Sequence, residues 1–147
     1  MPTRAQVAAG CSHRMRGMTL IELMVVVAIV AILASLAVGS YRRYVLRANR
    51  TDATSALLRI QVAEEKFFLQ NNAYTIDLSP AGLNVSSPTP NGFYTVAVAA
   101  GATGIATSFQ ATATATGAQT ADTSCQTLTI DDQGLRNSAP STTECWR

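Results

Sequence analysis

Residues 16–40, RGMTLIELMVVVAIVAILASLAVGS, carry the strongest structural signal in this sequence. From Met18 to Gly39 it carries a single charge, Glu22, and as an α-helix it would be about 33 Å long, enough to cross the hydrocarbon core of a bilayer. The basic segment before it ends at Gly17, so a cut there would leave the apolar helix on the mature chain, unlike a conventional secretory signal. The sequence therefore predicts a retained membrane-spanning helix over residues 18–39.

Length and composition limit how many domains the rest of the chain can form and which partners it is expected to bind. With 147 residues, 48% of them hydrophobic and 14% charged, there is room for one modest domain besides the apolar segment. The net charge of +2 depends on residues 1–17, which hold three of the 11 basic residues and no acid, so that 8 basic residues then face 9 acidic ones. A globally basic protein that coats nucleic acid is therefore not expected.

Cysteine and histidine usage points to an oxidising compartment and away from catalysis. Cys11 and the single histidine, His13, precede Gly17, which leaves Cys125 and Cys145 as an even pair. Such a pair suggests a disulfide that closes a loop of about 20 residues and stabilises the fold by about 3 kcal/mol. Because the mature chain has no histidine to act as a base, we expect no enzyme, no metal site and no cofactor.

Helical periodicity continues beyond the apolar segment. Residues 40–71 carry one apolar stripe at spacings of three or four, which predicts the amphipathic second half of the same helix. Asn71 and Asn72 end the pattern, and prolines and glycines then punctuate a long loop as far as Gly92. Gly39 weakens a helix by about 1 kcal/mol relative to alanine, so local unwinding near it stays open. The stripe consists of Ala53, Ala56, Leu57, Ile60, Ala63 and Phe67.

Three strands are expected in residues 72–147, which form the predicted head domain. Period-two patterns place them at Phe93–Ala99, Ser108–Thr114 and Gln126–Ile130, with turn residues between them. An antiparallel meander whose apolar face covers the helix stripe gives an α+β fold. The uncharged residues 102–121 are expected to form a weak edge hairpin or a mobile surface loop.

The string Arg16-Gly17-Met18-Thr19-Leu20-Ile21-Glu22-Leu23, followed by the apolar run, resembles the start of type IV prepilins. The resemblance implies a leader peptide over residues 1–17, which a dedicated membrane peptidase removes by cleavage between Gly17 and Met18. The same enzyme would N-methylate Met18, and Glu22 would become the fifth residue of the mature chain. Family members more often have phenylalanine at the position of Met18, and methionine is an accepted variant.

An acid inside an apolar segment needs a partner, because an unpaired carboxylate in hydrocarbon is strongly destabilising. For Glu22 the obvious partner is the α-amine that cleavage creates at Met18, supplied by a neighbouring subunit in a filament. This pair is predicted to set the axial register of the packed helices. The alternative is a plain single-span anchor, in which the helix dipole tolerates an acid in the first turn.

The C-terminal segment also resembles pilins. Cys125-Gln-Thr-Leu-Thr-Ile-Asp and the ending Cys145-Trp146-Arg147 are similar to the disulfide-bounded loop of the family, of minor pilins especially. The fold that this implies is a long N-terminal helix packed on a small antiparallel sheet. Family members commonly have a glycine and a proline where Ala31 and Gly39 stand, so this chain lacks a fixed proline kink.

Four arginines follow the apolar segment, with Tyr41 and Tyr44 among them: Arg42, Arg43, Arg47 and Arg50. One role for them is interfacial anchoring, with the aromatic rings at headgroup depth and the arginines against lipid phosphate. The other role is pairing with acids of neighbouring subunits in a filament. The two roles are compatible at different stages.

These features predict a structural subunit of a type IV pilus, more similar to a minor pilin than to the bulk pilin, which serves pilus biogenesis, adhesion or twitching motility. The resemblance implies other pilins, the prepilin peptidase and an assembly machine as partners. That machine must supply the ATPase, because this chain has no phosphate-binding loop. Before assembly we expect a single-pass inner-membrane protein with a periplasmic C-terminal domain, and afterwards a cell-surface location.

Two alternatives stay open. A DNA-uptake pilin should carry a basic surface patch, yet beyond Arg50 the basic residues are only Arg59, Lys66, Arg136 and Arg147. DNA is therefore a partner that the sequence admits without favouring. A pseudopilin of a secretion system would have the same N-terminal features. The terminal cysteine pair argues against this assignment.

Overall fold

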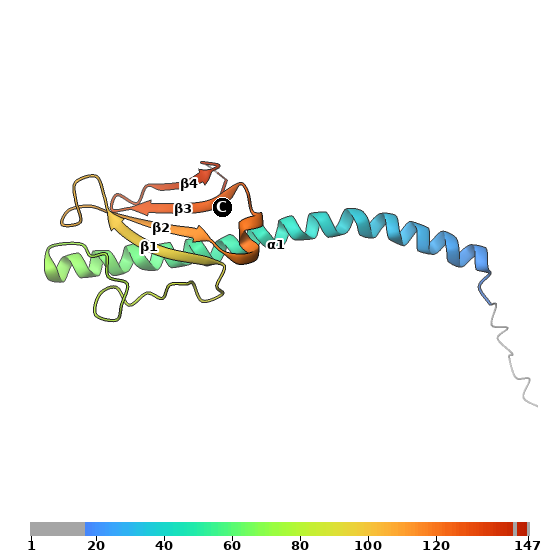
Figure 1. Cartoon of the computed structure of the whole chain (residues 1–147), viewed down its shortest axis with the longest axis horizontal. Helices are drawn as coiled ribbons and strands as arrows, with labels where there is room; N and C mark the ends of the chain where they lie inside the picture. Colours follow the sequence, from blue (N-terminus) through green and yellow to red (C-terminus); the bar gives the residue numbers. More distant parts are fainter. Residues whose placement is uncertain (1–16, 143, 147) are drawn as a thin grey trace, which may run out of the picture. The chain divides into compact units, whose positions relative to one another are not determined.

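The computed structural model describes residues 17–142 and 144–146, so Cys11, His13 and the three arginines before Gly17 fall outside the described residues. The chain divides into two compact units, Met1–Val38 and Gly39–Arg147. From here on we call the second unit the head; it includes the second half of the helix as well as the predicted domain of residues 72–147. Helix α1 extends over Leu20–Asn71 and contributes to both (Figure 1). It ends where the sequence pattern ended, because Asn72 takes a left-handed backbone with φ 54°. The helix is continuous through Gly39, so no unwound segment is present there.

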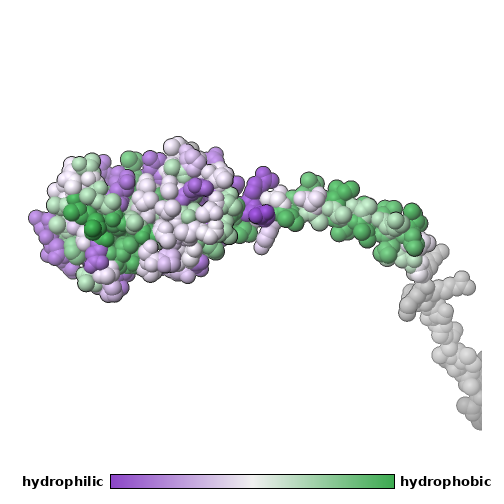
Figure 2. Space-filling view, viewed as in Figure 1, coloured by the Kyte–Doolittle hydropathy of each residue, from purple (hydrophilic) through white to green (hydrophobic). Residues whose placement is uncertain are grey.

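Among residues 17–38, the described part of the first unit, α1 has no packing partner. Every residue from Gly17 to Val38 is exposed, and Figure 2 shows this stretch as mainly hydrophobic. By length and composition, α1 is able to cross a membrane, and none of its most apolar part is buried in the protein. An apolar surface of this size is unfavourable in water, so lipid or other helices must cover it.

The second unit is built on a four-stranded antiparallel sheet with the order β1-β2-β3-β4. The strands are β1 (Tyr94–Ala100), β2 (Phe109–Ala115), β3 (Cys125–Asp131) and β4 (Arg136–Pro140), with a 3-10 helix, η1 (Gly117–Ala121), between β2 and β3. The three predicted strands are confirmed to within about one residue. The fourth was missed because its sequence, Arg-Asn-Ser-Ala-Pro, has no alternating apolar pattern and ends in a proline, which an edge strand tolerates.

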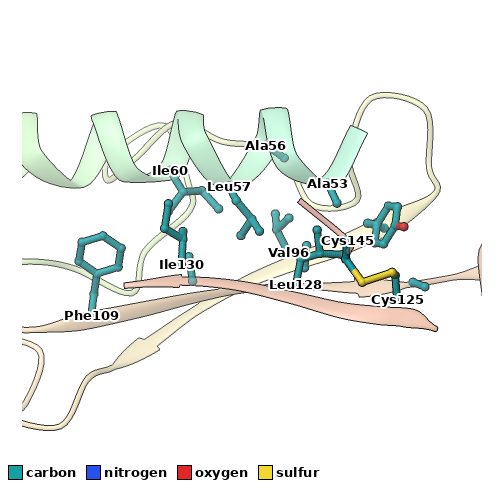
Figure 3. Packing of buried hydrophobic residues seen from close by; sticks show 14 of the residues in the cluster. Ala53, Ala56, Leu57, Ile60, Val96, Phe109, Cys125, Leu128, Ile130 and Cys145 are labelled. Atoms are coloured by element: carbon teal, nitrogen blue, oxygen red, sulfur yellow. A yellow bond between two sulfur atoms is a disulfide. The ribbon is translucent and has the colours of Figure 1, made fainter. Parts of the chain in front are cut away.

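The core lies between the sheet and the second half of α1 (Figure 3). The predicted helix stripe supplies its helical side, where Ala53, Leu57 and Ile60 are fully buried. Alanines at positions 111, 113 and 115 of β2 alternate with more exposed residues and belong to the same buried cluster as this stripe. The expectation of an edge hairpin or mobile loop over residues 102–121 is therefore wrong for β2, which is an interior strand paired on both sides.

Two buried carboxylates fasten the loop between α1 and β1 to the helix. Asp52 accepts hydrogen bonds from Thr89 Oγ1 at 2.5 Å and from Asn91 Nδ2 at 3.0 Å. Further along the helix, Glu64 Oε2 accepts from the backbone N–H of Thr75 at 3.1 Å. The long loop predicted from its prolines and glycines is thus an ordered cover for one side of the head.

Side chains occupy both outer edges of the sheet. On β1, the backbone N–H of Val96 donates to Ser87 Oγ at 3.1 Å, which brings the preceding loop onto that edge. On β4, the carbonyl of Asn137 accepts from Trp146 Nε1 at 2.8 Å, and the guanidinium of Arg136 lies 5.3 Å from the centre of the Trp146 ring. The C-terminal segment therefore covers β4.

Candidate functional site

The start of α1 carries the residues predicted to direct processing and assembly. Thr19 precedes the helix, and its Oγ1 accepts from the backbone N–H of Glu22 at 3.3 Å, which is the spacing of an N-terminal capping box. Glu22 lies in the first turn, where the helix dipole favours a negative charge. Within residues 17–142 and 144–146 its carboxylate takes part in no salt bridge. Glu22 therefore presents an unneutralised charge on an otherwise apolar helix surface.

The four arginines after the apolar segment do not form a uniform cluster. Arg42, Arg43 and Arg47 are exposed, whereas the side chain of Arg50 is only 11% exposed. Arg50 makes a bidentate ion pair with Asp122. Its Nε donates to Oδ2 at 2.7 Å, and its Nη2 donates to Oδ1 at 2.9 Å. The hydrogen bond to Asp122 raises the pKa of Arg50 above its ordinary value. Arg50 is therefore a structural link between α1 and the segment after η1. The other three arginines take part in no salt bridge within the described part of the chain.

A polar pocket of about 500 Å³ lies beside this ion pair. Its helical wall comes from one face of α1, and its other wall comes from the segment after η1 and from the C-terminal loop. Arg50 Nη1 also donates to the carbonyl of Glu144 at 3.3 Å, so one guanidinium holds both parts of the second wall. We call this the arginine pocket; it is lined by Arg43, Leu46, Arg47, Arg50, Ala121, Asp122, Thr123, Ser124 and Glu144.

Gln119 is the buried polar centre next to the pocket. Its Nε2 donates to the carbonyl of Leu46 at 3.0 Å and to the hydroxyl of Tyr94 at 3.1 Å, while its Oε1 accepts from Asn49 Nδ2 at 3.1 Å. Burial raises the pKa of Tyr94. Gln119 and Asp122 thus fix η1 against α1, and sequence reasoning missed both because their partners lie some 70 positions away in the chain.

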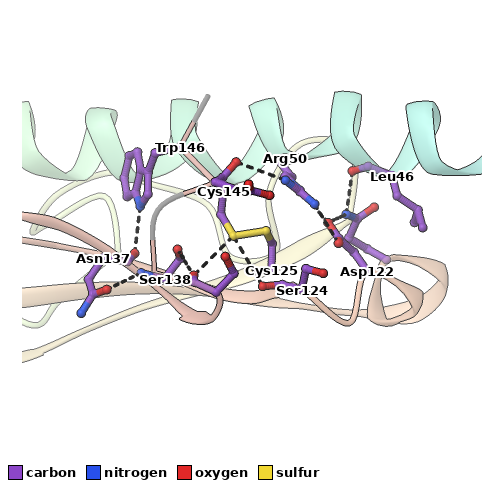
Figure 4. The surroundings of a disulfide bond; sticks show 12 residues. Leu46, Arg50, Asp122, Ser124, Cys125, Asn137, Ser138, Cys145 and Trp146 are labelled. Carbon is purple, nitrogen blue, oxygen red and sulfur yellow. Dashed lines mark hydrogen bonds and ion pairs between the residues drawn. A yellow bond between two sulfur atoms is a disulfide. The ribbon is translucent and has the colours of Figure 1, made fainter.

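The disulfide predicted from the cysteine pair joins Cys125 at the start of β3 to Cys145 (Figure 4). Both cysteines are fully buried, and their Cα atoms are 5.6 Å apart. The bond holds Ser124 and Glu144, the neighbours of the two cysteines, on the same side of the arginine pocket. The predicted arginine cluster and the predicted disulfide thereby meet at one place in the head.

Chemistry of other kinds has little support in the described part of the chain. Within residues 17–142 and 144–146, no group of three or more histidine, cysteine, aspartate or glutamate side chains is placed to hold a metal ion. Glu64 is fully buried and Glu65 is exposed, so the two adjacent acids do not face a common site. The features that the fold does assemble are an apolar helix with one acid and a basic pocket.

Comparison with known proteins identifies the family. The prokaryotic N-terminal methylation motif matches residues 12–38, and the family model described as "Type IV minor pilin ComP, DNA uptake sequence receptor" matches residues 39–129. The chain belongs to the type IV pilins. The second match covers more than half of this pilin and lies wholly within the unit Gly39–Arg147.

Two curated relatives and one solved structure agree with this assignment. The pilin is 32% identical over 108 residues to the fimbrial protein EcpC of Eikenella corrodens, covering 71% of this chain and 69% of that protein. It is 34% identical over 62 residues to the type IV major pilin protein PilA of Myxococcus xanthus, where the match spans 42% of this chain and only 28% of the relative. A type IV pilin structure from Shewanella oneidensis covers 69% of this chain and 98% of its own at 25% identity, with a TM-score of 0.50.

Proposed function

We propose that this pilin is a minor subunit of a type IV pilus, processed between Gly17 and Met18 and N-methylated at Met18. It is held in the inner membrane by residues 18–39, with its head in the periplasm, until the assembly machinery moves it into the pilus. The observation that supports this most is the exposed, mainly apolar surface from Leu20 to Val38, in which Glu22 is the only charged residue. Helices of other pilins can replace lipid around such a surface.

Glu22 has a specific part in this proposal. In the precursor the nitrogen of Met18 belongs to a peptide bond, so the positive amine arises only on cleavage. Met18 and Glu22 are four residues apart, which is about 6 Å if the helix extends to the new N-terminus after cleavage. A neighbouring subunit displaced by about one helical turn therefore brings its amine level with this carboxylate. Pairing inside an apolar bundle neutralises both charges and favours that single register over its alternatives.

The test is Glu22→Ala, with processing and assembly measured separately. Mass spectrometry of the mature chain should show that it begins at Met18 and carries one added methyl group. The variant should still be processed and retained in the membrane, yet it should be lost from sheared pili. Ser35→Ala is the matched control, because Ser35 lies in the same segment and its Oγ donates only to its own helix, at Ile32. Unchanged incorporation of the Glu22 variant would refute the register role.

The proposal of a minor rather than a major pilin is supported by the family model that matches the head, because that model is described as a minor pilin. Quantitative mass spectrometry of purified pili tests it directly. A trace amount relative to the bulk pilin is the expected result. If this chain made up most of the fibre, the minor assignment would be wrong while the pilin assignment would stand.

A second candidate function is capture of DNA during uptake, which the description of the same family model favours. Residues 39–147 contain 8 basic and 8 acidic residues, so this unit has no net charge to attract DNA at long range. Binding would then depend on base contacts more than on phosphate contacts, with a shallow dependence on salt. The full chain in detergent should retain duplexes from its own genome better than shuffled duplexes of equal length. Equal retention of both would exclude a sequence receptor.

A further inference from the structure

The arginine pocket combines a cavity, a charge imbalance and a position that the pilus role does not explain. Three guanidinium groups and two carboxylates line it, those of Asp122 and Glu144, which leaves one positive charge. Arg50 and Asp122 already neutralise each other. The excess charge therefore belongs to the exposed side chains of Arg43 and Arg47, one turn apart on the same face of α1.

The helical residues that line the pocket begin shortly after the apolar run in the sequence. Arg43 follows Val38, the last residue of the apolar run, by five residues, which is about 8 Å of helix. The headgroup layer on each side of a bilayer is about 5–8 Å thick. Arg47, one turn further along α1, lines the same pocket, and a long arginine side chain is able to extend back toward that layer. Tyr41 and Tyr44, 68% and 70% exposed, lie at the depth where aromatic residues favour membrane interfaces.

We propose that the arginine pocket binds the phosphodiester headgroup of one anionic phospholipid while the pilin is in the membrane. A phosphodiester carries a single negative charge, which balances the single excess positive charge of the pocket. Arg43 and Arg47 supply N–H donors to the phosphate oxygens, and the hydroxyls of Thr123 and Ser124 are additional donors. This inference rests on the proposed function, because it requires residues 18–39 to span the bilayer.

Lipid fits this pocket better than DNA does. A cavity of about 500 Å³ admits one headgroup, whereas a duplex contacts an extended surface through many phosphates. The described basic residues of the head outside the pocket's stretch of α1 are Arg59, Lys66 and Arg136, and none of them lines the pocket. The disulfide and Arg50 also hold the second wall in place without a ligand, so the pocket is preformed.

The experiment uses the full chain, reconstituted into vesicles of phosphatidylcholine with or without phosphatidylglycerol and then released for native mass spectrometry. The wild type should retain one phosphatidylglycerol molecule in preference to phosphatidylcholine. Arg43→Ala with Arg47→Ala should weaken that retention about 10- to 30-fold, as expected for two arginines at a membrane surface. Arg59→Ala with Lys66→Ala removes the same charge from the head outside the pocket and should leave retention unchanged.

A second pair of substitutions distinguishes a specific phosphate-binding site from general electrostatic attraction to an anionic membrane. Arg43→Lys with Arg47→Lys keeps the charge but loses the planar fork that binds two phosphate oxygens at once, so retention should fall several-fold. Full retention by this lysine variant would overturn the pocket in favour of simple surface charge. Equal retention of both lipids by the wild type, or loss of duplex DNA binding in the alanine variant without loss of lipid, would overturn it as well. If the chain inserted into neither vesicle, the proposed function itself would fail.

Discussion

The two halves of α1 have the same backbone and opposite surroundings. From Leu20 to Val38 every side chain is exposed, whereas in the second half Ala53, Leu57, Ile60 and Glu64 are fully enclosed by the head. The first half is apolar all round and the second has one apolar stripe. A helix that is apolar on every side needs partners that the chain itself does not supply, while a striped helix finds its partner in its own sheet. Burial of the second half therefore stabilises the fold of the chain itself, whereas burial of the first half stabilises its association with lipid or other helices.

The largest expected effect is on the stability of the head, and it should differ between substitutions in the two halves of α1. Leu57→Ala should lower the free energy of unfolding of the head by about 2–5 kcal/mol, because it leaves a cavity in a packed core. Leu33→Ala, in the exposed half, should leave head stability unchanged. Chemical denaturation of both variants in detergent, followed through Trp146 fluorescence, measures the two values. Equal destabilisation would show that the first half packs on the head.

Removing the disulfide is the next largest change. Cys125→Ser with Cys145→Ser should lower the free energy of unfolding by about 3 kcal/mol, because the unfolded chain regains the freedom of a loop of about 20 residues. Thermal unfolding with and without reductant provides the measurement. Cys11→Ser is the control: if the leader is removed as proposed, this variant gives a mature chain identical to the wild type.

Asp122→Ala should have a smaller effect, about 2 kcal/mol. It leaves Arg50 without its carboxylate, but Arg50 keeps the carbonyl of Glu144 and some contact with water, so the loss stays below the 3–5 kcal/mol of a fully buried pair. A double-mutant cycle with Arg50→Ala isolates the coupling between the two side chains. Additive effects of the two substitutions would mean that the ion pair contributes nothing to the head.

The smallest expected effect depends on pH. Burial raises the pKa of Glu64, so its contribution to stability is full below its unfolded pKa of about 4.3 and is lost as pH rises through the folded value. Glu64→Gln keeps an acceptor for the N–H of Thr75 and has no charge to bury. The variant should therefore be more stable than the wild type at pH 7, and this advantage should vanish near pH 4. Urea titrations across that range decide it, with exposed Glu65→Gln as the control, which should show no such difference.

The sequence predicted those parts of the pilin that depend on local pattern. The apolar run, the stripe on α1, three strands and the cysteine pair all have short-range signatures in residue type and spacing. β4 has none, since it is a polar edge strand defined by its pairing with β3. Gln119, Asp122 and Glu64 were not predicted as structural residues either, because burial decides their roles and burial follows from contacts between distant segments. The division of the four arginines into one buried and three exposed side chains has the same origin.

The covered edges of the sheet limit how copies of this protein can join. Ser87 occupies the hydrogen-bonding side of β1 at Val96, and Trp146 occupies that of β4 at Asn137. Free strand edges are templates on which other chains add strands and grow into amyloid-like aggregates. Contact between the sheets of two pilin copies carries that hazard, and these two side chains oppose it. If the pilin is assembled as proposed, polymerisation then depends on the apolar part of α1, which lipid covers until that helix enters a fibre.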